Sequence, residues 1–390
     1  MADIAAAHER AKQAVDVIFD DLVRISQAIH GRPELAFEER SAAQLLTEFL
    51  KGQGFAVERG TAGMETAFRA AWGSGPVTVA YLCEYDALPE MGHACGHNLI
   101  ATVGLAGGLG LKAAISPDDA RVLVLGTPAE EGGGGKVIMI QEGVFGDVDA
   151  ALMAHPGPVD IAAPPMFGVA QVEVRYRGKA SHASFAPELG VNALDALVTA
   201  YQAIAQLRQH IRRDARLHGI ITDGGTKPNI VPEHTAGEFY VRALDPSYLN
   251  DLKRRVERCF EAGATATGAT VEWKYRGFDY APMRNNGPLV ETYRRHAEGL
   301  GRRFYDGAGA DSTGSTDQGN VSEVVPAIHP LFGVGRPAVN HSPEFTEAAI
   351  TDEAHEAMRQ VGKGLALTGV DIVLDAGLLR RAREEFDAGR

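Results

Sequence analysis

The chain has 390 residues, of which 45% are hydrophobic and 23% are charged, and its formal net charge is −13. This length favours two domains over a single core. The acidic balance argues against a nucleic-acid partner, because phosphate binding requires a basic surface. No apolar run is long enough to span a bilayer, and residues 1–20 lack the basic start and apolar core of a secretory signal. Three cysteines at unrelated spacings do not suggest a disulfide framework. We therefore expect a cytoplasmic, reduced protein without membrane contact.

The first third of the chain alternates between helical and strand-like patterns. Helical periodicity runs through Ala5–Ile29 and again through Glu38–Lys51. An apolar, small-residue stretch at 99–115 is long enough for a buried helix. Three short apolar runs are typical of buried strands: Val77–Cys83, Arg121–Gly126 and Asp149–Ala154. Strands that are apolar on both faces and alternate with helices predict an α/β fold with a mostly parallel, helix-covered sheet.

The pattern changes near Val169, where residues 169–178 alternate between apolar and polar, as in a strand with one wet face. The following order of strand, helix, strand, strand, helix and strand predicts a small α+β domain with an antiparallel sheet. After it, residues 325–335 read as another buried strand, and Ala348–Leu367 as a closing helix. The simplest architecture is an α/β domain in two parts, 1–168 and 281–390, interrupted by an inserted α+β domain at 169–280.

Metal-binding residue types follow several of the predicted strands. They are Glu84, Asp86 and the GHACGHN motif at 92–98 after the first strand, Glu130 and Glu131 after the second, His155 after the third, and His341 after the late strand. Ligands of parallel α/β sheets gather at the carboxyl ends of the strands. We therefore expect these side chains at one edge of one sheet.

Each of these residues alone has an ordinary interpretation. His155 could be a capping or core histidine, and the Glu130–Glu131 pair could be a solvated turn. Adjacent acids at the end of a fully apolar strand, however, repel each other unless a cation lies between them. Together the residues predict a metal centre. Imidazole, thiolate and carboxylate donors suit zinc, and also manganese or cobalt, and their scattered positions are typical of an open catalytic site.

Seven motifs resemble, in order along most of the chain, the dinuclear-metal aminoacylase, carboxypeptidase and N-acyl-amino-acid hydrolase family. They are EYDALPEMGHACGHN, TPAEEGGGGK, MAHP, GKASHAS, KPNIVPE, GSTDQGNVSEVVPAIHP and NHSPEF. Within the family they are most similar to the branch of aminobenzoyl-glutamate hydrolase subunits and dipeptidase-like relatives. The resemblance implies an amidohydrolase that cleaves an N-acyl amino acid or small dipeptide by a metal-activated water. It also implies two divalent metal ions per subunit, zinc or manganese.

The resemblance assigns roles residue by residue. It implies five metal ligands, of which the first is a bridging thiolate where many relatives use aspartate: Cys95, His97, Glu131, His155 and His341. Glu130 matches the general base, and Asp86 matches a carboxylate that orients a ligand histidine. His93 is not a ligand in this interpretation.

The inserted domain also has a role in the resemblance, as a lid and a dimerisation domain. His182 is implied to reach into the active site of a partner subunit and stabilise the oxyanion. Asn229 and Arg242 match positions that hold the carboxylate of the substrate. The ordinary alternatives are a solvated or helix-capping histidine and a surface arginine. The expected partners are thus a small-molecule substrate and a second copy of the chain.

Two positions depart from many relatives, which have aspartate where this chain has Glu84 and Asn98. Both fit the aminobenzoyl-glutamate branch better than the auxin-conjugate and hippurate branches. The Gly/Ser-rich loop at 307–320 could line the substrate pocket or could only be mobile.

Two other functions compete with the metal-dependent hydrolase. Cys95 could be the nucleophile of a thiol amidase with His93 or His97 as its base, although this leaves the glutamate pair and the distant histidines unexplained. The chain could also be a non-catalytic or regulatory homologue, since a fold alone does not give function. None of the implied ligands is missing, and Glu130 is present.

Overall fold

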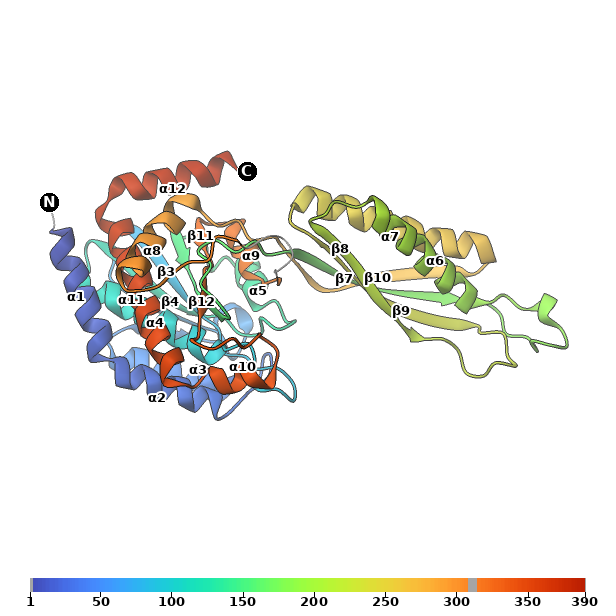
Figure 1. Ribbon diagram of the computed structural model, residues 1–390, viewed down its shortest axis with the longest axis horizontal. Helices are drawn as coiled ribbons and strands as arrows, with labels where there is room; N and C mark the ends of the chain where they lie inside the picture. Colours follow the sequence, from blue (N-terminus) through green and yellow to red (C-terminus); the bar gives the residue numbers. More distant parts are fainter. Residues whose placement is uncertain (1–2, 308–313, 390) are drawn as a thin grey trace. The chain divides into compact units, whose positions relative to one another are not determined.

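The structure is a computed structural model that describes residues 3–307 and 314–389 (Figure 1). These residues form two compact units. The first comprises residues 3–164, 283–307 and 317–389, and the second comprises 165–282 and 314–316. None of the described helices is long and apolar enough to cross a membrane.

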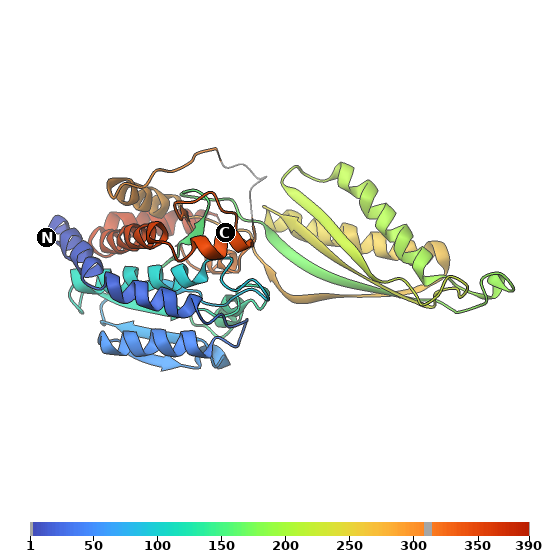
Figure 2. The ribbon, with the colours of Figure 1, turned by 60° about the horizontal axis from the view of Figure 1, so that its bottom comes forward.

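The first unit is built on a mixed sheet to which six of the described strands contribute, in the order β1-β2-β4-β3-β5-β11. Their bounds are Ala56–Arg59 (β1), Phe68–Trp72 (β2), Val77–Cys83 (β3), Ala120–Gly126 (β4), Ala150–Leu152 (β5) and Ala327–Ile328 (β11). β4, β3, β5 and β11 pair in parallel, whereas β1 and β2 add an antiparallel edge with α3 alongside (Figure 2). β6 (His155–Gly157) and β12 (Leu331–Gly333) form a separate parallel pair. The sheet is therefore mostly parallel, as expected.

Helices cover this sheet. They are α1 (Ile4–Val17), α2 (Phe19–His30), α3 (Arg40–Gly52), α4 (His97–Ala114), α5 (Gly135–Gln141), α8 (Gly287–Gly299), α9 (Gln318–Ser322), α10 (Pro343–Ala348), α11 (Asp352–Leu374) and α12 (Ala376–Ala388). α4 lies between β3 and α11 and is buried almost throughout. It packs this closely because Gly104 lies against the carbonyl of Leu82, where a Cβ would come within 2.6 Å of the oxygen. The start of α4, which carries His97, is thereby fixed against the end of β3.

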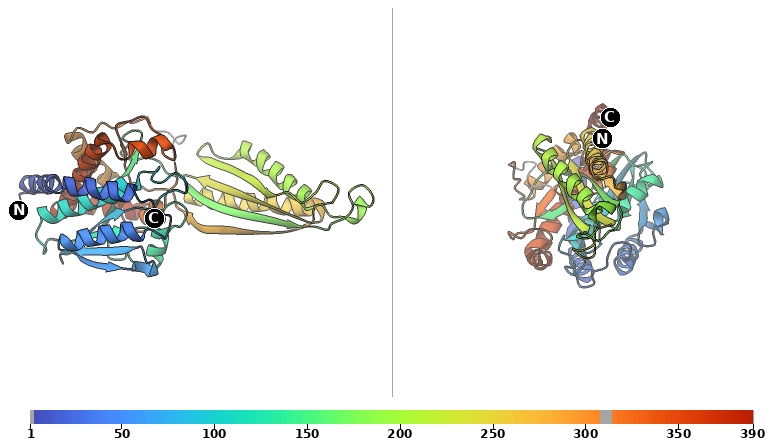
Figure 3. Two further views of the ribbon diagram at one scale, coloured as in Figure 1. Left: turned by 90° about the horizontal axis from the view of Figure 1, so that it is seen from below. Right: turned by 90° about the vertical axis from the view of Figure 1, so that its right-hand side faces the viewer.

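The second unit is an α+β unit with an antiparallel sheet in the order β10-β7-β9-β8 (Figure 3). Its strands are β7 (Gly168–Arg177), β8 (Ala215–Asp223), β9 (His234–Ala243) and β10 (Thr270–Tyr280), and its helices are α6 (Ala193–Leu207) and α7 (Pro246–Thr267). Alternate residues of β7, among them Val172, Val174 and Tyr176, are buried against the two helices. The prediction of an α/β fold interrupted by an α+β insertion is confirmed.

Three local predictions were wrong. The single helix expected over Ala5–Ile29 is two helices, because Ile18 has non-helical dihedrals (φ −96°, ψ 5°). The strand expected at 325–335 is two short strands, β11 and β12, which pair with different neighbours. The closing helix ends at Leu374 rather than Leu367, and α12 follows it.

A buried carboxylate joins three helices of the first unit. Asp371 of α11 contacts Nε2 of His8 in α1 and Nε2 of His296 in α8, each at 2.7 Å, and accepts a hydrogen bond from Arg295 at 2.8 Å. Burial alone would raise the pKa of Asp371, but the hydrogen bonds of His296 and His8 and their positive charge hold it well below its usual value. The carboxylate therefore stabilises the fold above its unfolded-state pKa of about 3.9, and this stability is lost as the pH falls through the folded-state pKa.

We predict that Asp371→Asn lowers the free energy of unfolding by about 1–3 kcal/mol at pH 7, because hydrogen bonds to a charged, buried acceptor are lost. The difference from the wild type should shrink as the pH falls below about 4, because the unfolded wild-type chain then binds a proton at this carboxylate that the folded protein does not bind. Thermal unfolding across this pH range measures both effects. Glu65→Gln, which breaks an exposed ion pair with Arg40, should change the melting temperature little. Equal effects of the two substitutions would contradict the prediction.

Candidate metal centre

The carboxyl ends of β3 and β4 place four acidic side chains next to each other. Glu84 and Asp86 follow β3 directly, and Glu130 and Glu131 lie in the loop after β4. This loop turns sharply, since Ala129 has a left-handed conformation (φ 60°) and Gly132 has φ 110°. The carbonyl of Ala129 accepts hydrogen bonds from Gly133 and Gly134 at 3.0 and 2.8 Å. The two glutamates thus lie on a tight, internally bonded turn.

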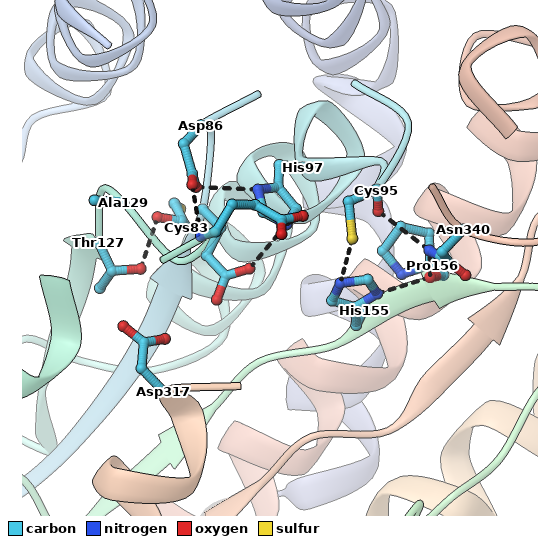
Figure 4. Close-up of polar contacts among 12 residues, drawn as sticks. Cys83, Asp86, Cys95, His97, Thr127, Ala129, His155, Pro156, Asp317 and Asn340 are labelled. Carbon is cyan, nitrogen blue, oxygen red and sulfur yellow. Dashed lines mark hydrogen bonds and ion pairs between the residues drawn. The ribbon is translucent and has the colours of Figure 1, made fainter. Parts of the chain in front are cut away.

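The structure brings all five proposed ligands together in the first unit. The donor atoms of three overlapping groups lie within 4.8 Å of one another: Cys95, His97 and His155; Cys95, Glu131 and His341; and His97, Glu130 and Glu131. Cys95 Sγ lies 3.4 Å from His155 Nε2, and His341 Nε2 lies 3.3 Å from Glu131 Oε1. Figure 4 shows the sulfur of Cys95 pointing toward the His155 ring.

Asp86 fixes the orientation of two neighbours. One of its oxygens lies 3.0 Å from His97 Nδ1, and the other accepts a hydrogen bond from the amide of Glu131 at 2.9 Å (Figure 4). Because Asp86 occupies Nδ1, the ring of His97 presents Nε2 to Glu131 and Glu84, at 3.9 and 3.6 Å. A second carboxylate that orients a histidine in this way is typical of metal sites.

The side chains fit a metal ion on two observations. First, the buried Nε2 of His97 has no hydrogen bond among the described residues, and the buried Oε1 of Glu131 has ion pairs with His341 and His97 but no hydrogen bond, which is costly for polar atoms in the interior. Second, burial raises the pKa of Glu130 well above its usual value, and the charges of Glu131 and Glu84 raise it further. Divalent cations would satisfy the orphaned atoms and offset this negative charge.

The same surroundings disfavour a thiol amidase. Burial raises the pKa of the Cys95 thiol, and the negative charge of Glu131 raises it further, so that these residues do not activate a thiolate. His93, a candidate base, is buried and stacks on the ring of His30 at 6.1 Å. Cys95 contacts His155 and lies beside His97, both of which are proposed metal ligands. A thiol in this position deprotonates when it binds a metal.

Asn98, one of the departures from related sequences, is buried at the start of α4. Its side-chain amide donates to Ser26 Oγ at 2.9 Å and to the carbonyl of Ala349 at 3.0 Å. Asn98 therefore ties α4 to α2 and to the chain that follows α10, which explains an amide at this position.

A buried ion cluster that was not predicted from the sequence lies beside the site. Lys136 of α5 contacts Glu84 at 2.5 Å and Asp317 at 2.6 Å, and none of the three side chains is exposed. A lysine inside the apolar run KVIMIQ was the only signal of this cluster. Of the loop at 307–320, residues 308–313 lie outside the described residues, whereas Asp317 reaches this cluster.

The remaining predicted residues lie in the second unit. His182 and Asn229 are exposed and neighbouring, since the amide of Ala183 donates to the carbonyl of Asn229 at 3.0 Å. His182 Nδ1 accepts from the amide of Phe185 at 3.2 Å, which leaves Nε2 as the protonated nitrogen of the neutral ring.

Arg242 is half-buried near the other end of β9, where it donates to Ser315 Oγ at 3.1 Å. β9 meets the end of β7 at His234, eight residues before Arg242 and on the side where His182 follows β7. Eight residues of a strand span about 26 Å. Within the second unit, Arg242 and His182 are therefore too far apart to contact one small molecule.

Comparisons with known proteins agree with this site. Residues 81–361 match Peptidase family M20/M25/M40. The chain belongs to this family. It is 43% identical to the Xaa-Arg dipeptidase of Mus musculus, over 99% of this chain and 93% of that protein. It is 31% identical to a component chain of the p-aminobenzoyl-glutamate hydrolase of Escherichia coli, over 93% of this chain and 91% of that protein.

A solved structure from Bacillus subtilis, described as a dinuclear metal binding peptidase of the M20 family, has the same fold. Its TM-score is 0.72 at 20% identity, with 92% of this chain and 99% of that chain covered. Family membership and these relatives make the chain a metal-dependent hydrolase of amide bonds, which confirms the expected class of enzyme.

Proposed function

We propose that the chain is a dipeptidase that cleaves small dipeptides with a free carboxyl-terminal carboxylate, using two divalent metal ions, zinc or manganese. The observation that carries this proposal is that five potential metal ligands lie close together in overlapping groups: Cys95, His97, Glu131, His155 and His341. We give dipeptides ending in arginine precedence, because the relative named for them shares 43% identity over nearly the whole chain. Hydrolysis of an N-acyl amino acid such as p-aminobenzoyl-glutamate is the second candidate, favoured by the relative at 31% identity.

When bound, the metal ions polarise the scissile carbonyl and acidify a water molecule. Glu130 lies beside His97 and Glu131. It accepts a proton from this water while the oxygen of the water bonds to the carbonyl carbon. It then returns the proton to the amine nitrogen as the carbon–nitrogen bond breaks. Asp86 keeps His97 and the backbone of Glu131 in place throughout.

We further propose that the inserted domain at 169–280 binds substrate and forms a homodimer. Arg242 suits a carboxylate because its Nε has no hydrogen-bond partner among the described residues. β8 is an edge strand of the sheet, and its Ile220 and Ile221 are 62% and 41% exposed. An exposed apolar edge strand favours pairing with a second copy. Since Arg242 and His182 lie apart within one chain, a partner would have to supply His182 if both residues contact one substrate.

The three cysteines are free, which agrees with a reducing, cytoplasmic location.

The substrate is tested by assaying the manganese- or zinc-loaded protein with dipeptides ending in arginine, with p-aminobenzoyl-glutamate, and with the same dipeptides amidated at the carboxyl terminus. We expect kcat/KM to fall by about 30-fold or more on amidation, because a buried charge pair with Arg242 is lost. Arg242→Ala should remove most of this difference. Equal rates for acid and amide would refute the carboxylate requirement, and activity that resists chelators would favour a thiol enzyme.

The two adjacent glutamates should behave differently. We predict that Glu130→Gln lowers kcat by about 10²–10⁴-fold, because the general base is lost, while the metal content stays at the wild-type level. Glu131→Gln, one residue away, should lower the metal content itself. Elemental analysis measures the metal content of both variants, and steady-state kinetics measures their kcat. A normal kcat in Glu130→Gln would exclude it as the base.

The role of a partner subunit is tested by mixing two inactive variants, His182→Ala and Glu130→Gln. In a heterodimer, the intact His182 of one chain can serve the intact Glu130 of the other, so a random mixture should recover about a quarter of the wild-type activity. Each variant alone should stay inactive. No recovery in heterodimers that are shown to have formed would mean that His182 acts within its own chain.

A further inference from the structure

A buried carboxylate outside the metal centre holds the loop that carries Glu130 and Glu131. Glu39, at the start of α3, is fully buried. Its Oε1 accepts a hydrogen bond from the amide of Ala129 at 2.9 Å and a second from the amide of Phe37 at 3.0 Å. Ala129, labelled in Figure 4, immediately precedes the two glutamates.

Both donors to this oxygen have an unusual backbone. Phe37 and Ala129 are left-handed, with φ of 64° and 60°, although neither is glycine. Residues with a Cβ adopt this conformation only where their surroundings enforce it. One carboxylate oxygen therefore accepts from two amides that the left-handed turns direct toward it, the buried amide of Ala129 and the part-buried amide of Phe37.

The side chain of Phe37 contacts the same loop. A Cβ on Gly133 would come within 2.7 Å of the Phe37 ring and within 2.5 Å of the Ala129 side chain, so only glycine fits between them. The loop is thus held by Glu39 from its first residue and covered by Phe37 four residues later.

The chain before Glu39 contacts the other acidic motif of the site. The carbonyl of Glu34 accepts a hydrogen bond from the amide of Ala87 at 2.8 Å, directly after Asp86. The Glu34 carboxylate accepts from the amides of Ser41 and Ala42 and so fixes the start of α3. The segment Glu34–Glu39 therefore joins the turn after β3 to the turn after β4.

We propose that Glu39 is a positioning residue for the metal centre, which holds Glu130 and Glu131 in place through the amide of Ala129. The proposal rests on the proposed function only in assigning Glu130 and Glu131 their roles.

The acceptor oxygen, rather than the negative charge, is what the geometry requires. Burial raises the pKa of the Glu39 carboxyl to about 7, so the charge is already costly in this place. Glutamine keeps an oxygen at the position of Oε1 and removes the charge, whereas alanine removes the acceptor and leaves the buried amide of Ala129 and the part-buried amide of Phe37 without it. A comparison of Glu39→Gln with Glu39→Ala therefore separates the effect of the acceptor oxygen from the effect of the negative charge.

We expect Glu39→Ala to lower kcat by about tenfold to 100-fold with KM within about threefold of the wild type, because misplacing catalytic groups by about 1 Å has this effect on rate. It should also lower the metal content, since Glu131 moves with the loop. Glu39→Gln should keep kcat and the metal content within about threefold of the wild type. Asp371→Asn, which removes a buried carboxylate from another part of the unit, is the matched control: it should lower the melting temperature and leave kcat unchanged.

Hydrogen exchange gives a readout that needs neither metal nor substrate. In Glu39→Ala, the amides of the peptide covering residues 128–136, which include the bonded amides of Gly133 and Gly134, should exchange at least about tenfold faster, whereas in Glu39→Gln and Asp371→Asn they should not. If Glu39→Ala does not fold, Glu39→Asp takes its place, because its shorter side chain falls one methylene short of the Ala129 amide.

Wild-type exchange and kcat in the alanine variant would overturn the proposal. Equal losses in the glutamine and alanine variants would also overturn it, because the acceptor would then not be the deciding feature. Faster exchange with unchanged kcat and metal content would mean that the loop does not need Glu39 to hold the site. If the wild type cleaves no dipeptide, the proposed function fails, and exchange and metal content still decide the role of Glu39.

Discussion

Several carboxylates lie close together at one edge of a buried sheet, and the neighbouring side chains of the first unit have to compensate their negative charge. Five acidic side chains lie there: Glu84, Asp86, Glu130, Glu131 and Asp317. Buried charges are stable only when they are paired or bind a cation. Lys136 pairs with Glu84 and Asp317, and His97 pairs with Asp86. Glu131 forms an ion pair with His341, but the charges of Glu131 and Glu84 still raise the pKa of Glu130, and divalent cations would offset this negative charge.

Backbone geometry, rather than side-chain length, brings the donors together over large sequence separations. His341 is left-handed (φ 65°), and its amide donates to the carbonyl of Ala94 at 2.8 Å, directly before Cys95. Ala129 is left-handed next to Glu130. Strained residues of this kind persist where surrounding contacts enforce them, and they are common at functional sites. These backbone contacts bring Cys95 and His341 together although they lie far apart in the sequence. The site therefore does not depend on long, flexible side chains.

Local patterns sufficed to predict the buried strands of the first third of the chain and the polar residues that follow them, because an apolar run followed by polar residues is recognisable in a short stretch of sequence. Val77–Cys83 was predicted with the bounds that the structure has, and Glu84 and Asp86 follow it. Glu39 and Lys136 could not be found this way. Their partners, Ala129 and Asp317, are 90 and 181 residues away, and a single acidic or basic letter in a helix carries no periodic signal. The break at Ile18 was missed for a related reason, since the apolar periodicity continues across it.

The separation of Arg242 from His182 bears on why such an enzyme would carry an inserted domain at all. The first unit holds every proposed metal ligand and the proposed base, so it contains the residues of the bond-breaking step. Residues that would bind the substrate carboxylate and stabilise the oxyanion lie at opposite ends of the sheet of the second unit. If both contact one substrate, two chains have to contribute, and a free subunit holds metal without a complete site. Assembly would then suppress hydrolysis of unselected amides by isolated subunits, because substrate binding and oxyanion stabilisation would require the pair.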